Sequence, residues 1–198
     1  LTLGTGTGNI GTLNYSAGTI IGQFERWLNA TETDYQFPIG SASNTNLMVV
    51  RFVAGFTAGS LIGEFNASNP GTAGLPVDDS GTPVDNTFTE GFWTLTAQNS
   101  LAATNYNIRL DAQGFVSHTI NSLTRIIKRT NGGNWTVDGV HVDASGTICY
   151  RNTLNGIATT TTDFCLGVSS CLGGPIGDAD TVCVDSDFVP FINYVSPS

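Results

Sequence analysis

The sequence predicts an all-β fold, an antiparallel β-sandwich of the Greek-key or jelly-roll kind, from three observations. Roughly a dozen short runs of alternating or β-branched residues recur about every 8 to 12 residues, separated by Gly, Asn, Asp and Pro. Charged residues make up only 12% of the chain and glycines number 24, a composition that disfavours helices and is typical of secreted β-rich proteins. With 198 residues the chain can bury a large core without help from metals or disulfides.

Short strands punctuated by glycine are expected in residues 1–22. Residues 23–30 are the one stretch that could be helical, but Phe24, Arg26 and Leu28 alternate with the positions between them, which favours a strand whose two faces are both partly covered. Further strands are expected at residues 33–39, 46–56, 60–66, 87–97, 106–110 and 115–120, with a long Pro- and Asp-rich loop at residues 70–86.

Residues 122–151 predict a meander of three strands, at 124–129, 135–142 and 147–151. The first turn, Asn131-Gly132-Gly133-Asn134, supplies residues that tolerate positive φ, as tight hairpins require. A second turn is expected at residues 143–146 and a third at Asn155-Gly156, before a last strand at 162–168.

The charge balance excludes several function classes. A net charge of −9 with only seven Lys and Arg argues against nucleic acid as a partner. Alternation places Arg125 and Arg129 on one face of their strand and Lys128 on the other, which predicts a solvated strand and no cationic patch. No run of 18 apolar residues exists, so membrane insertion is not expected.

Four cysteines fall in the last fifty residues of the sequence: Cys149, Cys165, Cys171 and Cys183. Their spacing fits no zinc pattern, and two disulfides would imply an oxidising compartment, although buried free thiols are the alternative. Three pairings are open, and Cys149–Cys165 with Cys171–Cys183 is the preferred one. We therefore expect a sandwich domain at residues 1–168 and a Gly/Asp-rich, disulfide-pinned extension or linker at 169–198.

Paired aspartates in this extension are the sharpest candidate for a metal site. Asp178, Asp180, Asp185 and Asp187 have the i, i+2 spacing that lets carboxylates on a loop converge on Ca²⁺, although a solvated acidic loop is the alternative. Asp78, Asp79 and Asp85 form a weaker candidate, since Asp also favours turns.

Candidate ligand-binding and catalytic residues are few. Trp135 follows the Asn-Gly-Gly-Asn turn and is expected to lie exposed, where its ring could stack on a sugar, whereas Trp93 is expected in the core. Glu64 and Glu90 are the carboxylates a glycosidase could use, but nothing marks them, and His141 has no marked serine partner. No catalytic residue is assigned, and we expect a protein that is not an enzyme.

Several pieces of the chain together carry a resemblance. They are residues 11–27, Phe37-Pro38-Ile39-Gly40, and residues 63–76, 91–97 and 125–139. As a set, spread over residues 9–168, they resemble a β-sandwich module of large type IX-secreted surface proteins of Bacteroidota. The resemblance implies a β-sandwich displayed on the cell surface or released outside the cell, as an internal piece of a longer protein, and it implies no catalytic residues.

The function expected from the sequence is that of a non-enzymatic structural or adhesive module of a secreted surface protein, or of a subunit of an extracellular fibre. Residues 1–7 and 188–195 could pair as strands with neighbouring modules or identical subunits, because unpaired strand edges are templates for another strand. The alternative is a carbohydrate-binding module of a secreted polysaccharide-degrading protein, with glycans as partners.

Overall fold

The computed structural model describes residues 1–157 and 160–169, and these residues form fourteen strands and no helix. The first sheet has the order β1 (Thr2–Leu3), β2 (Phe24–Leu28), β5 (Gly59–Asn66), β9 (Phe92–Gln98), β14 (Thr161–Val168) and β11 (Arg125–Thr130), and β8 (Asn86–Thr87) also pairs with β14. The second sheet has the order β12 (Val140–Ser145), β13 (Ile148–Ile157), β10 (Ala103–Asp111), β4 (Met48–Ala54) and β3 (Tyr35–Phe37). A separate hairpin joins β6 (Val77–Asp79) and β7 (Thr82–Val84).

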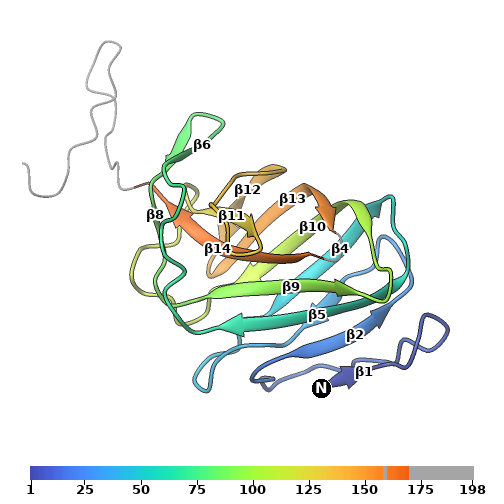
Figure 1. Cartoon of the computed structure of the whole chain (residues 1–198). Coiled ribbons are helices and arrows are strands. Elements are labelled where there is room, and N and C mark those ends of the chain that lie inside the picture. The colour runs from blue at the N-terminus through green and yellow to red at the C-terminus, as the bar shows by residue number, and fades with distance from the viewer. Residues whose placement is uncertain (158–159, 170–198) are drawn as a thin grey trace, which may run out of the picture.

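The two sheets lie one behind the other (Figure 1), and all their strand pairs are antiparallel except β1 with β2. The predicted all-β fold is therefore confirmed in the described residues, with a sandwich-like pairing of sheets. The stretch at 23–30 forms the strand β2, in which buried and half-buried residues alternate. Burial of every second residue is what the period of two along a strand requires when one face meets a core.

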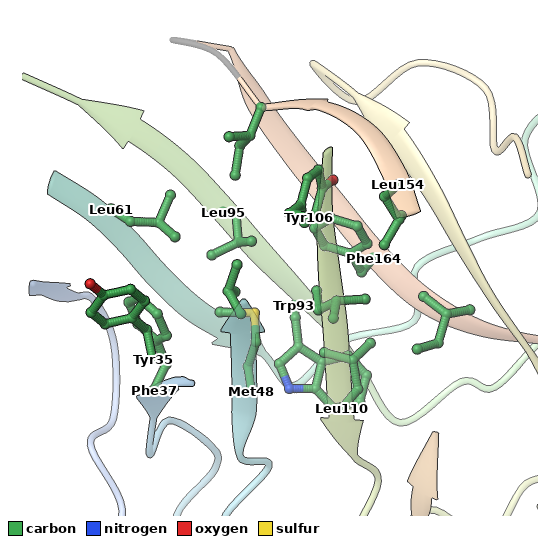
Figure 2. Packing of buried hydrophobic residues seen from close by; sticks show 14 of the residues in the cluster. Tyr35, Phe37, Met48, Leu61, Trp93, Leu95, Tyr106, Leu110, Leu154 and Phe164 are labelled. Carbon is green, nitrogen blue, oxygen red and sulfur yellow. The ribbon is translucent and has the colours of Figure 1, made fainter. Parts of the chain in front are cut away.

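One hydrophobic core fills the space between the sheets (Figure 2). The first sheet contributes Trp93 and Leu95 from β9, and the second contributes Tyr106 and Leu110 from β10. Trp93 is fully buried, as predicted, and its indole N–H donates a hydrogen bond of 2.8 Å to the carbonyl of Asn46. Burial of each such large apolar side chain stabilises the fold by about 1.5–3 kcal/mol.

The predicted strand at residues 115–120 is wrong, because these residues form no strand. The backbone N–H groups of Val116 and Ser117 donate to the Glu90 carboxylate at 2.7 and 2.5 Å, and the Ser117 hydroxyl donates to it at 2.7 Å. Burial raises the pKa of Glu90, but these hydrogen bonds outweigh burial and lower the pKa below its usual value. Glu90 thus holds this loop in place, because its carboxylate accepts the backbone hydrogen bonds that a neighbouring strand would otherwise accept.

The meander at residues 122–151 is only partly confirmed. Asn131 and Gly132 have the predicted positive φ, 52° and 67°, but the turn is followed by a single bridge, Lys128 with Thr136. The chain then crosses to the second sheet, where β12 and β13 form the expected hairpin. The turn predicted at Asn155-Gly156 lies inside β13, and the predicted loop at 70–86 contains the β6–β7 hairpin.

The preferred Cys149–Cys165 disulfide is wrong. Both cysteines are buried free thiols, and they belong to different hydrophobic clusters. Cys149 packs in the core between the sheets, whereas Cys165 packs in a cluster with Ile127 and Trp135. Cys171 and Cys183, and all of the predicted extension after Ser169, lie outside the described residues.

Candidate binding face

The outer face of the second sheet, which points away from the core, carries a row of polar side chains on its central strands. In β10, Ile108 and Leu110 are buried in the core, so Asn107 and Arg109 point outward. Residues opposite one another in an antiparallel pair share a face, and Arg109 lies opposite Val49 of β4 and Tyr150 of β13. The pairing register therefore gathers outward side chains from three strands at one place.

These side chains line a shallow hollow of about 170 Å³. Its lining includes Val49 and six polar residues: Asp34, Arg51, Asn107, Arg109, Tyr150 and Asn152. Enclosed small-molecule pockets are larger, on the order of 300–1,000 Å³. A hollow of this size on an open sheet suits one unit of an extended chain that lies across the face better than a ligand that must be engulfed.

The two arginines of the hollow differ in their partners. Arg51 donates to Asp34 from Nε at 2.6 Å, and its Nη1 lies 4.0 Å from Glu32. Arg109 is half-buried and has no carboxylate within ion-pair distance among residues 1–157 and 160–169. The hollow thus holds one neutralised cation and one whose charge is available to a ligand.

Other contacts position the polar groups around the hollow. The Asn107 side-chain oxygen accepts a hydrogen bond of 2.8 Å from the backbone N–H of Thr153, next to the register shift between β10 and β13. On the neighbouring strand β12, Val140 and Val142 are 59% and 39% exposed and lie opposite Asn152 and Tyr150. The hollow therefore has an apolar margin on the side of β12.

A buried ion network includes Arg151 of β13, which lies on the other face of that strand from Tyr150. Asp79 of the small hairpin accepts hydrogen bonds from Arg151 Nη1 at 2.7 Å and Nη2 at 2.9 Å. Arg125 Nε lies 3.1 Å from Asp79 Oδ2, within ion-pair distance but without hydrogen-bond geometry. The hydrogen bond from Arg151 holds the pKa of Asp79 below its usual value. The network joins the hairpin, β11 and β13, and the prediction that Arg125 is solvated is wrong.

His141 borders this network. Its Nε2 lies 2.8 Å from Arg125 Nη1, 3.0 Å from the Ser122 carbonyl and 3.3 Å from Asp143 Oδ1. Burial and the neighbouring Arg125 charge lower the pKa of His141, and they outweigh the opposite effects of Ser122 and Asp143. The neutral ring is therefore favoured in the folded protein, and its surroundings are those of a structural histidine.

The expectation that Trp135 lies exposed for sugar stacking is wrong, because its side chain is 1% exposed. Its indole N–H donates to the Gly71 carbonyl at 2.9 Å, and its backbone N–H donates to Ala73 at 2.8 Å. The Arg129 guanidinium lies 4.2 Å from the ring centroid and donates to Asp163 at 2.8 Å. Arg129 also donates to the Pro70 carbonyl at 3.0 Å, so both residues hold the loop that precedes the small hairpin. The Arg129 side chain is 14% exposed, and the prediction that it is solvated is wrong.

The predicted metal sites have different outcomes. Asp178, Asp180, Asp185 and Asp187 lie outside the described residues. Asp79 of the weaker candidate is taken up by two arginines, and the Asp78 carboxylate accepts the Gly81 N–H of its own turn at 2.9 Å. Within the described part of the chain, no group of three or more His, Cys, Asp and Glu side chains is placed to hold a metal ion.

Sequence reasoning missed the hollow, although part of its signal is present. The segment Tyr106–Leu110 alternates apolar residues with Asn107 and Arg109, which indicates an outward polar row on a central strand. The sequence does not reveal that Arg51 and Tyr150 flank the row, because the pairing of β4, β10 and β13 joins segments far apart in the chain.

Comparisons with protein-family models, curated proteins and solved structures gave no match to this chain. Over residues 1–157 and 160–169, no helix is long and apolar enough to cross a membrane.

Proposed function

We propose that this chain is a non-enzymatic adhesive module of a secreted surface protein and that it binds through the outer face of its second sheet. The observation that carries the proposal is the hollow on this face, with its six polar lining residues and the valine margin on β12. An open sheet face lets a long partner lie across it, and its aromatic, amide and charged side chains offer both stacking and hydrogen bonds. Carbohydrate binding is thus the form of adhesion that we favour.

Two further considerations support display outside the cell. The low charged fraction and the abundance of glycine are typical of secreted β-rich proteins. The resemblance to type IX-secreted modules of Bacteroidota points the same way.

We include in this proposal a jelly-roll-like topology and an extension with a Cys171–Cys183 disulfide and Ca²⁺ bound by its aspartates. Calorimetry with Ca²⁺ tests the last of these, and absence of a heat signal would contradict it.

Paired aromatic substitutions on opposite faces test the adhesive role. Tyr150→Ala removes the ring that lines the hollow, whereas Trp27→Ala removes an aromatic residue from the outer face of the first sheet. We expect the labelled wild-type chain to be retained on a panel of polysaccharide-coated surfaces and Tyr150→Ala to lose retention, with Trp27→Ala unchanged. Thermal melts establish that each variant is folded. Absence of retention on every surface, or equal loss in both variants, would contradict the proposal.

Strand pairing between copies is a second candidate, favoured by the strand β12. This strand forms an edge of the second sheet and exposes Val140 and Val142. Exposed apolar edge strands are templates for pairing, and a lysine there blocks it. The predicted pairing of the N-terminal strand with a neighbouring chain is less favourable, since Thr2–Leu3 already pairs with β2 of the same chain. Light scattering and electron microscopy of wild type and Val142→Lys test this candidate, and a monomeric wild type would remove it.

A further inference from the structure

Arg109 differs from every other cation of the chain in its surroundings, and all seven Lys and Arg lie within the described residues. Five are in ion pairs: Arg51, Arg125, Lys128, Arg129 and Arg151. Arg26 is buried over the rings of Tyr35 and Phe37 and donates to the Gln36 carbonyl at 2.7 Å. Arg109 is thus the one lysine or arginine with neither an ion pair nor a cation–π contact in residues 1–157 and 160–169.

The charge distribution makes this position distinctive. The chain carries a net charge of −9, which repels anionic polymers over most of its surface. The outer face of the first sheet adds to that repulsion, because it carries Glu25 and Glu64. What the hollow offers an anion is therefore Arg109 itself, which has no ion pair in residues 1–157 and 160–169, because the Arg51 charge beside it is already met by Asp34 and Glu32.

The neighbours of Arg109 suit a sugar better than a simple ion. Tyr150 can offer a ring face to a pyranose, and the Asn152 amide can donate to and accept from hydroxyl groups. An arginine guanidinium binds a carboxylate through two parallel hydrogen bonds, which gives direction as well as charge. Arginine, aromatic ring and amide together match a sugar unit that bears both hydroxyls and a carboxylate.

We propose that the hollow binds a carboxylate-bearing polysaccharide, with Arg109 contacting the carboxylate of one uronic acid unit and Tyr150 its ring. This inference rests on the proposed function, since it names the ligand class of the same face. Because the ligand is a repeating polymer, neighbouring units extend along the open sheet beyond the hollow.

The test measures affinity of the full chain for polygalacturonate by calorimetry or affinity electrophoresis. Fully methyl-esterified polygalacturonate is the matched ligand control, because it keeps the sugar ring and removes the charge. Arg109→Gln removes the cation. Gln98→Glu is the matched protein control, because it also makes the chain one unit more negative, at an exposed position on the outer face of the first sheet.

We expect the wild type to bind the unesterified polymer at least tenfold more tightly than the esterified one. Arg109→Gln should lose at least tenfold in affinity, Arg109→Lys should recover part of it, and Gln98→Glu should match the wild type. Unchanged binding by Arg109→Gln would overturn the inference. Equal affinity of the wild type for the esterified and unesterified polymers would also overturn it, as would an affinity for dextran sulfate equal to that for polygalacturonate. If neutral glycans bind and only Tyr150→Ala weakens them, the adhesive function stands and the anionic ligand class is wrong.

Discussion

Asp79 and Arg151, which are 72 positions apart in the sequence, form a bidentate ion pair. Arg151 Nη1 lies 2.7 Å from Asp79 Oδ2, and Nη2 lies 2.9 Å from Oδ1. Arg151 is 1% exposed and Asp79 is 7% exposed, so the pair is nearly sealed from water. The guanidinium Nε also donates to the Asp138 carbonyl. Asp79 is the carboxylate that compensates both Arg151 and Arg125, and it therefore links the small hairpin to both sheets.

Asp79→Asn should destabilise the fold by about 3–5 kcal/mol, because it leaves two buried guanidinium groups without a countercharge. Urea unfolding followed by fluorescence measures the change. Asp34→Asn is the matched control, since it breaks an ion pair with Arg51 whose two side chains are 42% and 43% exposed. That loss should stay below about 1 kcal/mol. Equal effects of the two substitutions would show that the buried network does not hold the hairpin.

Trp135 is predicted to stabilise the fold without contributing to ligand binding. Trp135→Phe removes the hydrogen bond to Gly71 and should cost about 0.5–1.5 kcal/mol. Trp135→Ala should cost roughly 3–5 kcal/mol, because it also opens a cavity beside Ile127 and Cys165. Retention of Trp135→Phe on polysaccharide should equal that of the wild type. A loss of binding with no loss of stability would restore the sugar-stacking role for this residue.

His141 should make stability depend on pH just below neutrality. Its pKa is lowered in the folded state, so the unfolded chain binds the proton more readily. Its contribution to stability is therefore present above the unfolded pKa of about 6.5 and is lost as pH falls through the lower folded pKa. His141→Gln should make the melting temperature less dependent on pH between about pH 7 and pH 5. His118→Gln is the control, and a weaker pH dependence in that variant alone would contradict the assignment.

Alternation predicts many of the strands and the side chains they place in the core, because burial on one face imposes the period of two along a strand. Phe24 and Leu28 of β2, and Trp93 of β9, lie in the core as their patterns indicate. One failure arises where a side chain replaces a strand partner. The segment at 115–120 has a strand-like pattern, but the Glu90 carboxylate takes its backbone donors.

Long-range pairing explains the rest of what the sequence leaves hidden. Arg125 and Arg129 share one face of their strand and suggest solvation, yet Asp79 and Asp163 pair with them from distant segments. The hollow has the same origin, since Arg51, Arg109 and Tyr150 meet only through sheet register. Each local sequence pattern is compatible with an exposed or a buried side chain. Segments elsewhere in the chain decide which of the two occurs, and the local pattern does not reveal where those segments lie.

Cys149 and Cys165 should stay unreactive until the protein unfolds. Burial raises the pKa of Cys149 to about 12 and raises that of Cys165 well above its usual value, so the nucleophilic thiolate is scarce at neutral pH. Alkylation at pH 8 followed by peptide mass spectrometry should leave both unmodified in the native state and label both in guanidinium chloride. Under the same non-reducing conditions we expect a linked peptide of Cys171 and Cys183. A linked peptide of Cys149 and Cys165 would contradict the packing of these thiols in separate clusters. A disulfide between these two cysteines would require β14 to rearrange.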